Sequence, residues 1–574
     1  MNKFICMHGH FYQPPRENPW TGEVDPEPSA KPFHDWNERI AKECYEANIQ
    51  APILNSKGQV SLRVNNFSKL SFDIGPTLLS WLRRKQPSTY KAIIQADQES
   101  VLKRQGHGNA IAQSYNHIIM PLAKRRDKVT QIVWGIRDFK FHYKRKPEGM
   151  WLSESAVDRE TMKIMADHGI LFTVLAPHQA KRYRHVGFGS RWHTVHHEAI
   201  DIRHPYRVVL EQGKQFHVFF YDALISRAIA FQGLLINGDQ LVQRLLGVFT
   251  LREREQLVST ATDGESFGHH HKFGEMAIAY GLKKIEDQKL AQLTNYGEYL
   301  SRFGSYREAD IVENSSWSCS HGVERWRADC GCRLNHQEGW NQKWRTVLRE
   351  AFDALQVSVD SVFEAEGGVL LKNPWQARND YIQVMLDDTV KERKKFLERN
   401  AKKMLNEEEE KKVWDLLEAE KFSLFMYTSC GWFFDDISGL EPVQVMKFAA
   451  RAMELTQPYC KEDLEKKLLK TLSAAKSNIP EHGTGENIFI KVVKSARNIL
   501  SAPPLPHRPD SVQKGSKKEP VWVLSAVLSV CPTSANPPSS TLSRAARLWP
   551  PIILLRRLIR TSESSPFRIN VCRS

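Results

Sequence analysis

The sequence predicts an α/β protein in which a barrel-like β/α domain (residues 1–300) precedes a mainly α-helical domain (301–500) and a disordered basic tail (501–574). A chain of 574 residues is too long for one ordinary domain. In the first part, continuous apolar runs alternate with segments of helical periodicity, which is typical of a parallel sheet covered by helices. At this length, the alternation favours a closed barrel over a small open sheet.

The elements of the first part can be placed from their apolar runs and their end signals. Buried strands are predicted at 3–7, 170–176, 216–222 and 257–263, and helices at 158–169 and 273–279. Asp158 is a favourable N-cap residue for the first of these helices, and Gly169 is a favourable residue just past its C-terminus. This strand-helix-strand order is the clearest βαβ unit in the chain.

The second part has the pattern of a helical domain. Asn406 can cap a helix whose first turn, 407–410, is entirely acidic and so suits the positive end of the helix dipole. Apolar residues at helical spacing follow it, and another helix is expected after Pro442. We expect these helices to pack on the barrel and to contribute to the substrate cleft.

The tail differs from the rest of the chain in composition. It holds eleven of the 28 prolines and thirteen serines without sustained periodicity, so it is expected to be disordered. Its eleven Lys or Arg and three Asp or Glu give +8 of the net charge of +15, and the other 500 residues carry only +7. A positive charge spread so thinly over the folded part of the chain does not indicate a nucleic-acid partner. The abrupt change in composition indicates an aberrant end, such as a frameshift.

Cysteine usage and hydropathy predict the compartment. Nine unevenly spaced cysteines favour reduced thiols over a disulfide framework, and therefore a cytoplasmic protein. The chain begins without the run of about 7–15 apolar residues that a signal peptide needs. It also lacks a run of about 18 apolar residues, so no membrane partner is expected. The oligomeric state is not predicted.

Two acidic residues end apolar runs and precede helix-like segments. Glu154 closes the run 149–154, and Asp263 closes the run 257–263. Residues at the C-terminal ends of parallel strands face the active-site mouth of an α/β barrel. Two carboxyl groups about 5–5.5 Å apart at such a mouth can serve as the nucleophile and the acid of a retaining glycosidase. A strand-end acid taken alone is more often a helix cap or an ion-pair partner.

Five short motifs, in order along the chain, carry a family resemblance. They are His8-Gly9-His10-Phe11-Tyr12-Gln13-Pro14-Pro15, Gly106–Asn109 with Tyr115–His117, Trp151–Glu154, Thr262–His269 and Trp317–Trp326. On these motifs the chain resembles glycoside hydrolase family 57, whose members act on α-glucans through a seven-stranded (β/α) barrel and a retaining mechanism. The resemblance is strongest over residues 1–330. The helical part resembles the extra domain of an uncharacterised branch with longer members, which implies a missing C-terminal region.

The resemblance implies roles for residues at matching positions. The nucleophile of the third motif corresponds to Glu154, and the acid/base of the fourth corresponds to Asp263. Ser153 stands where the family usually has proline, and Phe11-Tyr12 is a two-residue expansion of the first motif. The implied substrate is an α-glucan or maltooligosaccharide, and the mechanism needs no cofactor. Amylase, 4-α-glucanotransferase and branching activities are not distinguished.

Further residues are expected to bind the substrate. By the resemblance His8, His10 and His117 line the sugar pocket, and the fifth motif supplies substrate contacts through Trp317, His321 and Trp326. The indole rings of Trp151, Trp317 and Trp326 are candidate surfaces for stacking against a sugar. Asp222 is expected to line the site, and Glu265 to support the acid/base by hydrogen bonding.

Three alternatives remain open. His8-x-His10 is compatible with a metal-dependent barrel hydrolase, which would need further His and Asp ligands at later strand ends. An inactive glucan-binding protein is the second alternative. The third is a zinc site formed by Cys319, His321, Cys330 and Cys332. Their spacing lacks the paired Cys-x-x-Cys knuckles of strong zinc motifs, so no metal site is predicted.

Overall fold

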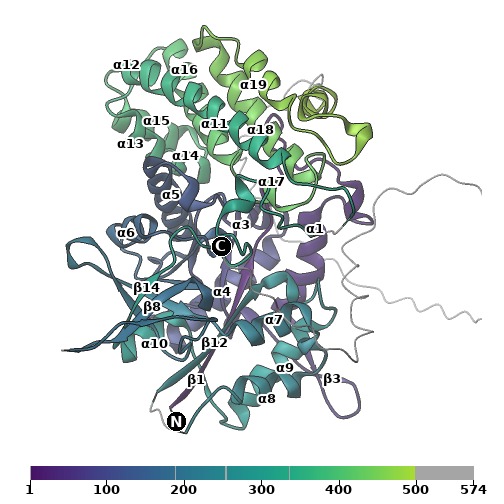
Figure 1. Ribbon diagram of the computed structural model, residues 1–574, viewed down its shortest axis with the longest axis vertical. Helices are drawn as coiled ribbons and strands as arrows, with labels where there is room; N and C mark the ends of the chain where they lie inside the picture. The colour runs from purple at the N-terminus through teal and green to yellow at the C-terminus, as the bar shows by residue number, and fades with distance from the viewer. Residues whose placement is uncertain (1, 188, 252–254, 335–336, 498–574) are drawn as a thin grey trace, which may run out of the picture. The chain divides into compact units, whose positions relative to one another are not determined.

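A computed structural model of the chain describes residues 2–187, 189–251, 255–334 and 337–497 (Figure 1). Met1–Asn498 form one unit, and the tail predicted at 501–574 lies outside the described residues. Within this unit the helices that follow residue 344 gather at one end and the strands at the other (Figure 1). The predicted order, an α/β part followed by a helical part, is confirmed.

Strand β1 (Lys3–Phe11) is the centre of the first sheet. It pairs in parallel with β12 (Gln256–Asp263), with β4 (Ser71–Ile74) and with β13 (Gln292–Leu293). All but its first residue are buried, as expected of a parallel strand covered on both faces. The strand predicted at 3–7 therefore exists and continues to residue 11.

The second sheet has six strands in the order β7-β11-β10-β14-β8-β9. These strands are β7 (Phe172–Leu175), β11 (Gln215–Phe220), β10 (Tyr206–Val209), β14 (Arg307–Ile311), β8 (Ala180–His185) and β9 (His193–Thr194). The strands predicted at 170–176 and 216–222 are confirmed as β7 and β11. Because β14 pairs with β10 and β8, the α/β part extends past the predicted boundary at residue 300.

Short links connect the two sheets. Strand β5 (Ala112–Gln113) pairs in parallel with β6 (Met150–Trp151). Isolated bridges join Phe72 to Ala110 and Gly149 to Phe172. Beyond β11, the Asp222 amide donates to the Ser259 carbonyl over 2.7 Å. The ladders of the described residues thus form four separate sheets, counting the hairpin of β2 (Ala51–Leu54) and β3 (Val60–Val64), and no closed barrel ladder.

Helices cover the strands of the α/β part. Asp158 caps α6 (Arg159–Asp167) by accepting the Thr161 amide at 2.7 Å, and Gly169 follows that helix at φ +85°. The helix predicted at 273–279 is confirmed within α9 (Gly274–Asp287). The others in this part are α1 (Trp36–Ile40), α2 (Glu46–Ile49), α3 (Pro76–Lys85), α4 (Pro87–Lys103), α5 (Arg125–Tyr143), α7 (Ala223–Phe231), α8 (Gly238–Leu246) and α10 (Tyr296–Phe303).

The helical part begins with α11 (Trp344–Val362). As predicted, Asn406 caps α16 (Glu407–Phe425), in a capping box in which the Glu409 carboxylate accepts the Asn406 amide. Helix α18 (Leu440–Thr456) packs on α16 through Phe422 and Phe448, whose rings stack at 5.9 Å. The others are α12 (Gly368–Leu370), α13 (Pro374–Asp380), α14 (Ile382–Leu386), α15 (Val390–Asn400), α17 (Cys430–Phe433), α19 (Leu464–Leu472), α20 (Gly485–Ile488) and α21 (Lys494–Arg497).

A buried ion network joins the helical part to the α/β part. Arg378 on α13 donates to Asp127 on α5 at 2.8 Å and to Glu420 on α16 at 2.7 Å. All three side chains are at most 3% exposed. Removing one member of such a network leaves the others buried without a partner, which is strongly destabilising. None of the helices that the structure describes combines the length and apolar character needed to span a bilayer.

Candidate active site

Glu154 lies in a tight turn just beyond β6. The turn Ser153–Ser155 places Glu154 at φ +56° and Ser155 at φ +48°, the left-handed region that costs a non-glycine residue about 1–2 kcal/mol. Ser153, which stands where family 57 usually has proline, is fully buried and shares a 2.8 Å hydrogen bond with Ser114. Strained backbone held by its surroundings is a feature that clusters at functional sites.

Two side-chain donors converge on the Glu154 carboxyl group. The Trp317 indole N–H donates to Glu154 Oε2 over 3.1 Å, and the Ser318 hydroxyl donates to the same oxygen over 2.6 Å. The Trp317 amide also donates to the Glu154 carbonyl at 2.9 Å. Since an ionised carboxylate can only accept hydrogen bonds, both donors suit the charged form. Residues 317 and 318 of the fifth motif therefore bind the glutamate of the third motif.

Asp263 is the last residue of β12 and lies opposite His10 of β1 in the parallel register. Its side chain keeps an exposed surface, as a group that meets a substrate must, while the protein around it displaces much of the bulk water. This desolvation raises the pKa of Asp263 to about 6. The charge of His10 opposes the increase in pKa, and the negative charge of Glu154 adds to it.

Glu265 follows in the turn Gly264–Ser266 and is buried. It accepts a hydrogen bond from the Tyr45 hydroxyl at 2.7 Å and another from the Tyr12 amide at 3.2 Å. Burial, with the nearby Asp263, raises the pKa of Glu265 to about 7. Glu265 therefore lies close enough to Asp263 to feel its charge and is bonded to the first motif, but the hydrogen bonds described for its side chain go to Tyr45 and Tyr12, not to Asp263 as the sequence predicts.

A histidine–carboxylate network lies beneath these carboxyl groups. Asp73 of β4 bonds to His8 Nε2 at 3.0 Å and to His10 Nδ1 at 2.8 Å. The other nitrogen of His8 bonds to the Ser71 hydroxyl at 3.1 Å. His8 is fully buried and both its nitrogens are occupied, so the prediction that it lines the sugar pocket is wrong, and it shares Asp73 with His10.

The pKa shifts in this network show which histidine carries the positive charge. Burial alone favours a neutral His10, but Asp73 outweighs it and raises the pKa of His10 to about 9. Burial and the charge of His10 lower the pKa of His117 well below its usual value. His10 is thus the cation, and its Nε2–H donates to His117 Nε2 at 3.2 Å. His117 Nδ1–H then donates to the Ser429 hydroxyl at 2.7 Å, which brings the helical part into the site.

The aromatic residues have different positions from those predicted. Trp151 lies under His8 and His10, whose rings stack on it at 5.0 and 5.1 Å, and it is 0% exposed. Trp326 belongs to the main hydrophobic core and is 1% exposed. The prediction that these two indoles offer a face to a sugar is therefore wrong. Trp317 is only half-buried, and Tyr12 stacks on His117 at 3.8 Å.

Two further predicted residues make contacts other than with the two carboxyl groups. The Asp222 carboxylate accepts a hydrogen bond from the Ile225 amide at 2.8 Å and so caps the N-terminus of α7. This is a structural role. His321 lies beside Cys332, with its Nδ1 3.5 Å from the cysteine sulfur. Of the predicted set, the structure therefore gathers Glu154, Asp263, Glu265, His8, His10, His117, Trp151 and Trp317 around one site.

Several residues of this site were not predicted. Asp73, Ser318 and Ser429 each contact a residue of the site, and so does Tyr12, which had been noted only as part of an expanded motif. Asp73 could have been proposed from the sequence, because an acidic residue near the end of a short strand is a candidate site residue. This strand, β4, lies next to β1. Ser429 could not have been, since it meets His117 across 312 positions of sequence.

An α/β domain that carries two carboxyl groups at the ends of parallel strands has the architecture of a carboxylate-dependent glycosidase. The sequence profile of glycosyl hydrolase family 57 matches residues 8–312, more than half of the chain, and the chain belongs to this family. The predicted resemblance is confirmed, and the protein is a glycoside hydrolase or transglycosidase. A second profile, a domain of unknown function (DUF3536), matches residues 340–502 and so covers the helical part.

Solved structures resemble this chain to different degrees. An exo-type maltose-forming amylase from Pyrococcus sp. ST04 superposes with a TM-score of 0.61 at 17% identity, over 82% of this chain and 83% of that one. A branching enzyme from Pyrococcus horikoshii gives a TM-score of 0.49 at 14% identity, over 87% and 95%. A 4-α-glucanotransferase from Thermococcus litoralis gives 0.47 at 15% identity, over 81% and 61%. No curated protein sequence matches significantly.

Proposed function

We propose that this chain cleaves α-glucans by double displacement, with Glu154 as the nucleophile and Asp263 as the general acid/base. The observation that carries the proposal is the contrast between the two carboxyl groups. Glu154 accepts two donors that suit a carboxylate, whereas desolvation raises the pKa of Asp263 to about 6. Two carboxyl groups with opposed environments are the usual basis for separate nucleophile and acid roles.

In the first step Glu154 attacks the anomeric carbon while the protonated Asp263 gives its proton to the departing glycosidic oxygen. The bond to the leaving sugar breaks as the glycosyl–Glu154 ester forms. In the second step the Asp263 carboxylate takes a proton from water or from an acceptor sugar hydroxyl, whose oxygen displaces Glu154. The His10 cation lies near Asp263 throughout and favours its carboxylate form in the second step.

The glucan substrate and the barrel are further parts of the proposal. Family membership and the amylase whose fold the chain shares support an α-glucan or maltooligosaccharide. We propose that seven strands, in the order β1-β4-β5-β6-β7-β11-β12, make up an irregular barrel. The bridges between β4, β5, β6 and β7, and the bond from the Asp222 amide to β12, support this order.

Azide rescue tests the two roles separately. With an α-glucosyl fluoride donor, Glu154→Ala should lose activity by orders of magnitude and regain it with azide, giving the inverted β-glucosyl azide. Asp263→Ala should still form the glycosyl-enzyme, because fluoride leaves without an acid, and azide should then give the retained α-product. The exposed Glu211→Gln variant should behave like wild type. Near-normal turnover of maltoheptaose by Glu154→Ala would overturn the assignment, and products longer than seven units would show transfer.

A further inference from the structure

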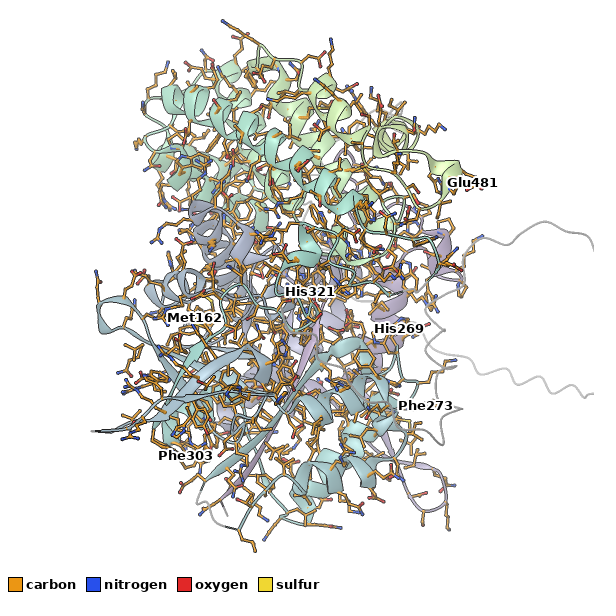
Figure 2. All side chains as sticks on the ribbon, viewed as in Figure 1. Met162, His269, Phe273, Phe303, His321 and Glu481 are labelled. Carbon is orange, nitrogen blue, oxygen red and sulfur yellow. The ribbon has the colours of Figure 1, made fainter. Side chains whose placement is uncertain are left out.

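Three cysteines and one histidine gather just beyond the loop that contacts Glu154. Cys319, His321, Cys330 and Cys332 each offer one ligand atom, and these four atoms lie within 4.8 Å of one another. Within the ranges that the structure describes, no other group of three or more His, Cys, Asp or Glu residues has this arrangement. His321 is visible where the α/β and helical parts meet (Figure 2).

Three of the distances between these atoms match those between ligands of a zinc ion. Tetrahedral zinc, with Zn–S near 2.3 Å and Zn–N near 2.0 Å, places sulfurs about 3.8 Å apart and a sulfur and a nitrogen about 3.6 Å apart. Here Cys319 Sγ lies 3.9 Å from Cys330 Sγ and 3.8 Å from Cys332 Sγ. Cys332 Sγ lies 3.5 Å from His321 Nδ1.

The same distances argue against disulfides. A disulfide joins two sulfurs at about 2.0 Å, and here one sulfur has two others at nearly equal, much longer distances. All three thiols are free in the structure. A shared central ion is the arrangement that accounts for three sulfurs and an imidazole nitrogen converging on one point.

The backbone around the cluster is shaped for this convergence. Gly331 separates Cys330 from Cys332 at φ +80°, a left-handed conformation that glycine adopts without strain. Gly322, beside His321, has the same φ, and a Cβ there would meet the Asn314 carbonyl oxygen at 2.4 Å. Both glycines therefore allow turns that aim neighbouring ligands inward.

We propose that Cys319, His321, Cys330 and Cys332 form a structural zinc site. Four protein ligands fill a tetrahedron and leave no open position, which is the mark of a structural site and not a catalytic one. The sequence alone does not predict a metal site here, because the Cys-x-x-Cys knuckles are absent. The fold replaces them with Cys-x-His and Cys-x-Cys pairs brought together across the loop.

The ion would fix a loop with contacts on two sides. On one side Trp317 and Ser318, directly before Cys319, donate to Glu154. On the other side Arg345 of α11 donates to the Cys332 carbonyl at 2.8 Å and to the Phe434 carbonyl at 3.1 Å. Zinc would thus connect the helical part to the loop that holds the proposed nucleophile.

Metal analysis of the purified full chain tests the site independently of enzyme activity. We expect one zinc per chain by elemental analysis, and thiols at 319, 330 and 332 that react with Ellman's reagent only after chelation. Cys332→Ser and Cys330→Ser should lose the zinc. Cys460→Ser changes a half-buried thiol away from the cluster and should retain it. Cobalt in place of zinc should give the absorption bands of tetrahedral thiolate coordination.

Hydrogen exchange separates the proposed role from simple metal binding. Removing zinc should increase amide exchange over residues 315–334 by at least tenfold, with little change in α16 and α18. The proposal is overturned if the wild-type chain binds neither zinc nor cobalt, or if mass spectrometry finds a disulfide among the three cysteines. Since the proposed function can fail while zinc is still bound, these results do not depend on the catalytic assignment.

Discussion

Trp317 holds Glu154 by two separate hydrogen bonds. Its indole N–H donates to Glu154 Oε2 at 3.1 Å, and its amide donates to the Glu154 carbonyl at 2.9 Å. The two residues are 163 positions apart, so the contact is a product of the fold. It fixes both the backbone and the carboxylate of a residue that already has left-handed φ. We therefore expect the reactivity of Glu154 to depend on Trp317.

Trp317→Phe keeps an aromatic ring and removes the indole donor. A hydrogen bond to a charged group contributes about 1.5–3 kcal/mol, so kcat/KM on maltoheptaose should fall about 10- to 150-fold. Steady-state kinetics measures the loss, and circular dichroism checks the fold. Trp375→Phe is the matched control, because the Trp375 indole also donates to a glutamate, Glu364, but at the surface of the helical part. Equal losses in both variants would contradict a specific role for Trp317.

The pKa of Asp263 sets the pH dependence of the proposed reaction. The first step needs the protonated form, and desolvation raises the pKa of Asp263 to about 6. In the free enzyme kcat/KM should therefore fall about tenfold per pH unit above pH 6. A pH profile with α-glucosyl fluoride, whose leaving group needs no acid, should lack this decline. A decline that persists with the fluoride would assign the titration to another group.

The same shift in pKa predicts a change in stability. The folded state holds the Asp263 proton more tightly than the unfolded state, so ionisation destabilises the fold from about pH 4, and fully above pH 6. Asp263→Asn removes that charge. Its Tm should exceed that of wild type at pH 8, and the difference should disappear near pH 3.5. Calorimetry at both pH values makes the comparison, and an equal difference at both would contradict the linkage.

The sequence predicted the parts of the site that lie within short motifs. Glu154 and Asp263 could be predicted because each ends an apolar run, and His10 because it belongs to the His-x-His motif that resembles family 57. The bonds from Asp73 to His10 and from Ser429 to His117 span 63 and 312 positions, and no local pattern encodes such pairings.

The wrong prediction for Trp151 and the lack of a continuous barrel ladder among the described residues have a common local cause. Strand β6 has only two residues, too few to show which way a side chain points, and Trp151 turns into the core. The pairings that connect β4, β5, β6 and β7 are likewise only one or two residues long. The sequence therefore could not show whether these strands close into a barrel. Long elements such as α16, with a cap and an apolar stripe, were predicted correctly.

The Asp73–His10 pair should make stability depend on pH. Because Asp73 raises the pKa of His10 to about 9, the pair stabilises the fold fully below the unfolded pKa near 6.5, and this contribution is lost as pH rises through 9. Asp73→Asn should cost about 3–5 kcal/mol at pH 6.5 and flatten the pH dependence between 6.5 and 9. Urea unfolding at both pH values measures this. Asp239→Asn, at an exposed ion pair with Lys284, should change little.

Arg378 should be required for the two parts of the chain to hold together. Arg378→Met keeps most of the side-chain volume but leaves Asp127 and Glu420 buried without their cation. Breaking a buried network in this way costs about 3–5 kcal/mol, which is a large share of a typical folding free energy. Arg393→Met, which removes an exposed ion pair with Asp388, should cost at most about 1 kcal/mol. Chemical denaturation should give this order, and similar losses in the two variants would show that the network does not stabilise the join.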